Sequence, residues 1–86
     1  MAVKFTTQTG SVYVVDAVRQ FWQKNDGAVW RLHSYGAGAS RTEPWVSPDD
    51  WQQDRLPVVG EHLYVCGPSP KWWVSTKIVE VTECSI

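Results

Sequence analysis

The fold of this chain is decided by the stretch QFWQKNDGAVWRL, which occupies residues 20–32. Asn25-Asp26-Gly27 is its strongest turn signal, because these residue types accept the backbone conformations of tight hairpin turns. Aromatic and β-branched residues lie on both sides of the turn, which is typical of paired strands. The stretch therefore predicts a β-hairpin.

The register of this hairpin follows from its large apolar side chains. A three-residue loop, with its glycine in the left-handed region, pairs Trp22 with Trp30 and Gln20 with Leu32. A two-residue loop would instead set Trp22 opposite Arg31. The three-residue loop gathers the apolar side chains on one face, so we prefer that register.

Turn signals divide the rest of the chain into further strands. We expect strands at residues 3–8, 11–24 and 28–35, another that follows a turn at Gly60-Glu61 and ends at Gly67, and a last one at 71–84. The second of these is too long for one flat strand and predicts a bend or bulge near Asp16-Ala17. The glycine-rich residues 36–40 predict a flexible loop.

Alternation along the first two strands predicts which side chains point inward. Val3, Phe5, Val12 and Val14 share a face across the turn at residues 9–10. Even-numbered residues of the second strand, continuing through Val18, are expected inward. Asp16 is the exception, because a buried carboxylate needs a bulge, a basic partner or the rim of the sheet.

One short helix is expected. Ser47 can cap it, Pro48 suits the first helical position, and two aspartates follow at the positive end of the helix dipole. The helix extends to about Arg55, because Pro57 ends it. The predicted fold is mainly β, a small twisted antiparallel sheet or β-barrel of five or six strands with one short helix near residues 48–55, in a single domain spanning residues 1–86.

Composition narrows the classes of function. The net charge is −1, whereas a dedicated duplex-DNA binder usually shows a basic footprint. No apolar run approaches the roughly 18 residues of a membrane span, and the first residues lack a signal-peptide pattern. We therefore expect a cytoplasmic protein without a membrane partner. Cys66 and Cys84 are expected as free thiols in a reducing compartment.

The outward face of the central hairpin is the first candidate binding surface. In the predicted register Arg19 lies opposite His33, Phe21 lies opposite Arg31 in cation–π distance, and Tyr35 continues the row. Arginine and aromatic side chains on a solvated sheet are typical of surfaces that recognise acidic proteins or single-stranded nucleic acid. The alternative is an ordinary solvated strand face with cross-strand pairs.

The chain has six tryptophans. We assign Trp22 and Trp30 to the core, and Trp45 and Trp51 to a cover beside the predicted helix. Neighbouring residues of a strand point to opposite faces, so the adjacent Trp72 and Trp73 cannot both be buried by one sheet face. Exposed tryptophan is enriched at interfaces. We therefore expect Trp72 or Trp73 to anchor a protein partner or a dimer interface.

Little in the sequence points to catalysis. His62 and Cys66 share a strand face, but the closely spaced ligand pairs of a structural zinc site are missing. Residues 36–41 lack the ending of a phosphate-binding loop. Asp50 and Asp54 are expected to solvate the helix rather than to form an acid–base pair. We expect a non-enzymatic protein with no catalytic residue, metal or cofactor.

Two segments carry a resemblance to a group of known proteins. Residues 3–16, VKFTTQTGSVYVVD, and residues 75–81, STKIVEV, resemble small uncharacterised β proteins of phages, prophages and integron cassettes. In those proteins a first hairpin and a closing strand frame a variable middle. The resemblance implies an accessory protein of a mobile element that acts by binding.

A second resemblance is to the tryptophan-bearing stretch of small chitin- and cellulose-binding modules. It is carried by Gly60-Glu61, Tyr64, Gly67 and Trp72-Trp73. The favoured expectation remains a binding protein whose partner is another protein or a second copy of itself. The alternatives are a single-stranded nucleic-acid binder, whose affinity falls as salt rises, and a carbohydrate binder, whose affinity does not respond to salt.

Overall fold

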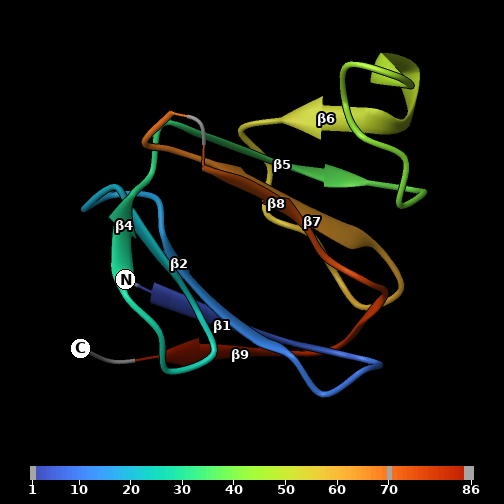
Figure 1. Cartoon of the computed structure of the whole chain (residues 1–86). Coiled ribbons are helices and arrows are strands. Elements are labelled where there is room, and N and C mark those ends of the chain that lie inside the picture. Colours follow the sequence, from blue (N-terminus) through green and yellow to red (C-terminus); the bar gives the residue numbers. More distant parts are fainter. Residues whose placement is uncertain (1, 70, 85–86) are drawn as a thin grey trace.

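The computed structural model describes residues 2–69 and 71–84, apart from the side chain of Cys84. Within these residues the chain forms nine strands and one 3₁₀ helix (Figure 1). The strands are β1 (Ala2–Thr7), β2 (Val12–Asp16), β3 (Phe21–Lys24), β4 (Val29–Arg31), β5 (Ser34–Gly38), β6 (Trp51–Gln53), β7 (His62–Cys66), β8 (Trp72–Val74) and β9 (Ile78–Cys84). The 3₁₀ helix is η1 (Pro48–Asp50).

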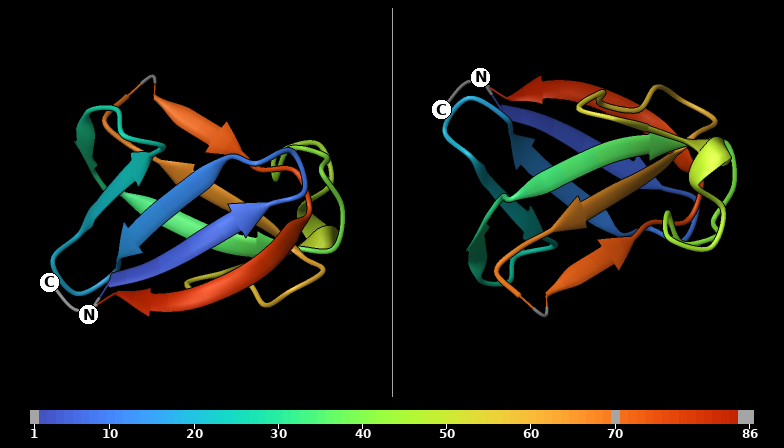
Figure 2. Two further views of the ribbon diagram at one scale, coloured as in Figure 1. Left: turned by 90° about the horizontal axis from the view of Figure 1, so that it is seen from below. Right: turned by 90° about the horizontal axis from the view of Figure 1, so that it is seen from above.

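The strands form two antiparallel sheets, with orders β4-β3-β2-β1-β9 and β6-β5-β7-β8. Figure 2 shows the sheets as two layers whose strands cross one another. The mainly-β prediction is confirmed, and the sheets are not closed into a barrel. The strands outnumber the expected five or six for two reasons. Breaks at residues 17–20, 32–33 and 75–77 each divide a long predicted strand, and β6 forms where helix was expected.

The central hairpin has the predicted register. Trp22 pairs with Trp30, and Phe21 pairs with Arg31. Trp22 is buried in the core, and its Nε1 donates a hydrogen bond to the carbonyl oxygen of Gly67 at 2.9 Å. Trp30 is half-buried and packs against the same core.

The hairpin turn uses a different left-handed residue from the one predicted. Asn25 has φ +54°, and Gly27 is not in the left-handed region. The backbone N–H of Gly27 donates to the carbonyl oxygen of Lys24 at 3.1 Å, which closes the turn. The side-chain Oδ1 of Asn25 accepts from the N–H of Val12 at 2.9 Å, so this residue also ties the turn to β2.

The bend predicted near Asp16 is present as the turn at residues 17–20. The buried Oδ1 of Asp16 accepts hydrogen bonds from the backbone N–H groups of Val18 and Arg19, at 3.0 and 2.9 Å. The Nε of Arg19 lies 4.0 Å from the other carboxylate oxygen. The bond from the Arg19 backbone is the main cause that lowers the pKa of Asp16. The turn and the basic neighbour together explain how a carboxylate is buried here.

The inward face of β2 is the opposite of the predicted one. Tyr13 and Val15 are buried, and Tyr13 pairs with the buried Phe5. Val15 pairs with Trp22, so an odd-numbered residue of β2 shares a face with an even-numbered residue of β3. Val3 pairs with Val15, so the prediction that Val12 and Val14 share a face with Val3 and Phe5 was wrong. The turn at residues 17–20 reverses the alternation between β2 and β3. Val18, expected inward, is 82% exposed in that turn.

The core lies between the two sheets. Its buried members come from both layers, and they are Phe5, Tyr13, Val15, Trp22, Leu32, Leu63, Val65 and Ile78. Fully burying a side chain of this size stabilises a fold by about 1.5–3 kcal/mol. Among the described residues, no helix has the length and apolarity needed to cross a membrane.

Residues 36–38 are part of a strand and not of the flexible loop that the composition of residues 36–40 predicts. Gly36 and Gly38 belong to β5, which pairs with β6 on one side and β7 on the other. A Cβ at Gly38 would lie 2.6 Å from the ring of Trp51, and one at Gly36 would lie 2.8 Å from the carbonyl oxygen of Gln52. These glycines are therefore required for the close approach of β6 to β5.

The predicted helix begins at Pro48 but ends after one turn, at Asp50. Ser47 occupies the N-cap position without a side-chain capping hydrogen bond. Trp51 then enters β6, where it is buried and donates from Nε1 to the carbonyl oxygen of Thr42 at 2.6 Å. Packing of this indole against β5 outweighs the local helix signals that follow Asp50.

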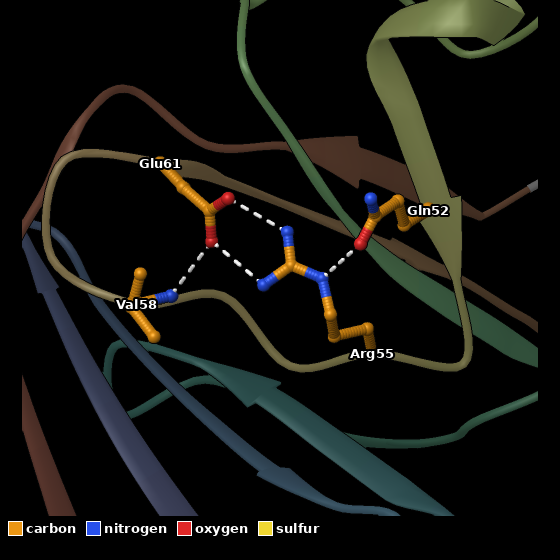
Figure 3. Close-up of polar contacts among 4 residues, drawn as sticks. All are labelled: Gln52, Arg55, Val58 and Glu61. Atoms are coloured by element: carbon orange, nitrogen blue, oxygen red, sulfur yellow. Dashed lines mark hydrogen bonds and ion pairs between the residues drawn. The ribbon is translucent and has the colours of Figure 1, made fainter.

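The segment between β6 and β7 is held by a bidentate ion pair (Figure 3). Nη1 and Nη2 of Arg55 donate to the two carboxylate oxygens of Glu61 at 3.0 and 2.6 Å, and Nε donates to the side chain of Gln52. The carboxylate also accepts from the N–H of Val58 at 2.9 Å. Hydrogen bonding to Arg55 holds the pKa of Glu61 below its ordinary value.

Candidate functional site

The predicted row of Arg19, Phe21, Arg31, His33 and Tyr35 is divided between the two sheets. Phe21 and Arg31 pair as predicted, but the cation–π contacts of the described residues involve lysines instead. Arg19 lies in the turn before β3 and not opposite His33, which is exposed between β4 and β5. Tyr35 lies on β5, half-buried against the core. The chain changes sheets at residues 32–34, so these five side chains do not form one face.

The adjacent tryptophans of β8 are both accessible. Trp72 and Trp73 are each 42% exposed. Their strand is at the edge of the second sheet, beside β7. The prediction that one ring of this pair remains exposed is confirmed and extends to both rings.

On one face of β8, Trp72 joins a chain of edge-to-face aromatic contacts. Its ring centroid lies 4.7 Å from that of Trp45, which lies 6.2 Å from that of Tyr64. Tyr64 in turn lies 6.0 Å from Trp51. We call these four residues the aromatic row, and its contacts hold Trp72 in one orientation. Burial raises the pKa of Tyr64 to about 12. Trp51 is buried as a cover, whereas Trp45 is 57% exposed.

On the other face of β8, Trp73 lies beneath a lysine. The Nζ of Lys24 is 3.4 Å from the centre of a Trp73 ring, and the Nζ of Lys71 is 4.9 Å from that of Trp30. Partial burial lowers the pKa of Lys24, and the neighbouring charge of Arg41 lowers it further. A cation over an indole face is attracted to it, more strongly where water is excluded.

Two hollows flank the tryptophan pair. The larger has a volume of about 430 Å³ and is lined by Arg41, Glu43, Trp72, Trp73 and Val74. The smaller has a volume of about 240 Å³ and lies between β8 and the β3–β4 hairpin, which contributes Trp22, Lys24 and Trp30. Lys71 lines the smaller hollow as well. Trp72 and Trp73 line both, so the hollows form one surface.

We call this surface the tryptophan–cation surface, and its members are Lys24, Trp30, Arg41, Lys71, Trp72 and Trp73. It holds three of the eight Lys and Arg residues of the chain. Of the acidic residues, Glu43 also lines it. The local excess of positive charge contrasts with a net charge of −1 for the whole chain. Such a patch attracts anionic groups.

The residues considered for metal binding and catalysis are dispersed. In the described parts of the chain, no three His, Cys, Asp or Glu side chains are grouped as metal ligands. A ring nitrogen of His62, Nδ1, lies 2.9 Å from the carbonyl oxygen of Ser75. Cys66 is a free thiol on the same strand. The prediction for the Cys84 side chain lies outside the described residues.

Three cations of the surface were missed by sequence reasoning. Lys24 is near the hairpin turn, Arg41 follows β5, and Lys71 precedes β8. No periodic pattern links positions so far apart in the chain. Only the stacking of the two sheets brings them to the tryptophan pair, and the pair itself was the one part of the surface with a sequence signal.

Comparisons with protein-family models, with curated proteins and with solved structures find no match for this chain. The resemblance to mobile-element proteins therefore stays a prediction.

Proposed function

We propose that this protein is a non-enzymatic binding protein that engages an anionic macromolecule through the tryptophan–cation surface. The observation that carries the proposal is the gathering of three cations around two half-exposed tryptophans at a sheet edge. Tryptophan and arginine are the side chains that most often dominate binding energy at interfaces. The surface combines both with two hollows that a ligand can fill.

The chemistry of the lining side chains supports binding rather than catalysis. The described residues that line the hollows supply indoles, ammonium groups, a guanidinium and one carboxylate. Nucleophilic catalysis needs a nucleophile that an adjacent base, a lowered pKa or a metal activates, usually with a further group that orients it. The Nζ of Lys24, whose pKa is lowered mainly by burial, lies 3.4 Å from the centre of a Trp73 ring, where it makes a cation–π contact.

The partner favoured from sequence, a protein or a second copy of the chain, fits this proposal if it presents acidic side chains. The proposed site of action is the cytoplasm, where the free thiol of Cys66 would persist. A role as an accessory protein of a mobile element rests on the sequence resemblance. A neutral sugar would use the tryptophans but would leave the three cations without a role.

A titration of tryptophan fluorescence tests the proposal. The probes are an oligothymidylate strand, a polyglutamate peptide and a neutral oligosaccharide, each at low and high salt. We expect at least one anionic probe to bind, with an affinity that falls as salt rises and falls further in Lys71→Gln. Lys4→Gln removes an exposed charge from β1 and is the matched control. Absence of binding by both anionic probes at low salt, or salt-independent binding of the sugar alone, would contradict the proposal.

A further inference from the structure

We infer that the anionic ligand of the tryptophan–cation surface is single-stranded nucleic acid. This inference rests on the proposed function and names the partner of the same surface. A single strand presents two chemical groups in alternation, a phosphate and a flat base. The surface presents their two complements, cations and exposed indole rings, within the same pair of hollows.

The cations are divided between the two hollows that the tryptophan pair lines. Arg41 lines the larger hollow, and Lys24 and Lys71 line the smaller one. A strand that passes from one hollow to the other therefore meets positive charge at each end of its path. Backbone phosphates of a bound strand would be neutralised at these points, with release of counterions.

The rings offer stacking surface along the same path. Trp72 and Trp73 each keep 42% of their surface exposed and point to opposite sides of β8. Each ring thus faces a different section of a strand that crosses the edge of the sheet. Base stacking on aromatic side chains is tolerant of sequence, because every base has a π face.

Trp72 is held ready for such a contact. Its edge-to-face contact with Trp45, at 4.7 Å between ring centroids, restrains the indole from one side. Little rotational freedom is then lost when a base stacks on the exposed part of the ring, which favours binding. Trp73 differs, because the ammonium of Lys24 already lies over one of its ring faces.

Other anionic polymers fit this surface less completely. An acidic peptide satisfies the cations but supplies no regular series of flat groups for the indoles. Duplex DNA hides its base faces within the stack and is contacted mainly through phosphates and groove edges. A duplex would therefore use the cations of this surface but would leave its two exposed indole rings without bases to stack on.

The number of cations sets the expected salt dependence. For single strands, log K falls with log salt by about 0.7 for each phosphate neutralised. Three cations give a slope of about −2, which is roughly a 20-fold loss of affinity between 50 and 200 mM salt. Removal of one cation should reduce the slope to about −1.4.

Fluorescence anisotropy of a labelled oligothymidylate tests the inference on the full chain. We expect a slope of about −2 for the unmodified protein and about −1.4 for Lys71→Gln, with Lys4→Gln unchanged. Trp72→Ala should weaken binding by about 5- to 150-fold, the range found for loss of one stacking ring. Trp72 is partly buried, so melting curves are needed to show that the Trp72→Ala variant is folded. Lys71→Gln tests the same surface without removing a ring.

Three results would overturn the inference. One is the absence of saturable binding to the oligonucleotide at low salt. Another is binding that Lys71→Gln and Trp72→Ala leave unchanged while Phe21→Ala, on the first sheet, weakens it. The third is tighter binding of polyglutamate than of the oligonucleotide, which would leave the proposed function standing with a protein as partner. If neither polymer binds, the proposed function fails as well.

Discussion

Gly38 is the position at which one added methyl group should disturb the fold most directly. It lies in β5, opposite Trp51 of β6. A Cβ at this position would lie 2.6 Å from one ring atom of Trp51 and 2.7 Å from two more. The indole cannot simply rotate away, because its Nε1 donates to the carbonyl oxygen of Thr42 and the ring contacts Tyr64. In Gly38→Ala, either the ring or β6 must move.

The expected loss of stability can be worked from these contacts. Overpacking of this kind destabilises a protein by about 1–3 kcal/mol. Replacing glycine by alanine also lowers the entropy of the unfolded chain, which offsets about 0.4–1 kcal/mol. The net effect of Gly38→Ala should be about 1–2 kcal/mol. For a domain of this size that lowers Tm by roughly 4–16 °C.

Thermal unfolding followed by circular dichroism measures this effect. The matched variant is Gly38→Ala combined with Trp51→Leu, which removes the ring atoms that the methyl group meets. In the Trp51→Leu background, Gly38→Ala should lower the free energy of unfolding by less than about 0.5 kcal/mol. The two substitutions are coupled because residues 38 and 51 are in direct contact. If Gly38→Ala is as stable as the unmodified protein, or if its cost is the same beside Trp51→Leu, the packing argument for β5 and β6 is wrong.

Three further predictions concern the ion pair, the buried tyrosine and the core indole. Glu61→Gln should lower stability by about 1 kcal/mol, since the bidentate pair with Arg55 is partly exposed. The pKa of Glu61 is lower in the folded protein than its ordinary value of 4.5, so the ion pair stabilises the fold fully above about pH 4.5. This stabilisation is lost as pH falls through the pKa of Glu61 in the folded protein. Urea unfolding at pH 7 and pH 3 checks both, and an equal cost of the substitution at the two pH values would contradict them. Burial raises the pKa of Tyr13 to about 12, so stability should fall as pH rises from 10 to about 12. An absorbance titration with normal ionisation of every tyrosine near pH 10, in folded protein, would contradict this. Trp22→Phe leaves the carbonyl oxygen of Gly67 without its indole donor and should lower stability by about 1–3 kcal/mol in urea titrations. An unchanged midpoint would show that this hydrogen bond does not matter.

The parts of the fold that were predicted are those that local chemistry determines. The turn residues at 25–27 and the size of Trp22 and Trp30 are sufficient for the hairpin register, because a slip would move every large side chain to the wrong face. The bend after Asp16 was also predicted, because residues 11–24 are too long for one flat strand. The inward-facing side chains of β2 were not predicted correctly. The four-residue turn at residues 17–20 reverses the alternation between β2 and β3, and its length is not evident from the sequence.

The parts that were not predicted depend on contacts between distant elements. Gly36 and Gly38 have the composition of a loop. They form a central strand because the backbone of Gln52 approaches Gly36 closely and the indole of Trp51 packs against Gly38. The same burial converts the expected helix after Asp50 into β6. Intrinsic propensity is a weak guide wherever tertiary packing of a large ring is available.

The candidate site likewise has residues that were predicted from the sequence and residues that were not. Adjacent tryptophans in a strand face opposite sides, so the sequence predicts that one ring of the pair, Trp72 or Trp73, stays exposed. That both rings are exposed is a finding of the structure. The row from Arg19 to Tyr35 failed as a single face because the chain crosses between sheets after Leu32. The cations that complete the surface come from three separate segments and required the folded chain to be recognised.

The six indole N–H signals of this chain provide the most direct test of the central claim. In a ¹H–¹⁵N spectrum recorded during titration with oligothymidylate, the indole signals of Trp72 and Trp73 should shift. That of Trp51 should not, because its N–H group is held by the carbonyl oxygen of Thr42 and this residue lines neither of the two hollows. Shifts confined to backbone amides of the first sheet, with the β8 indole signals unmoved, would contradict the assignment of the tryptophan–cation surface as the binding site.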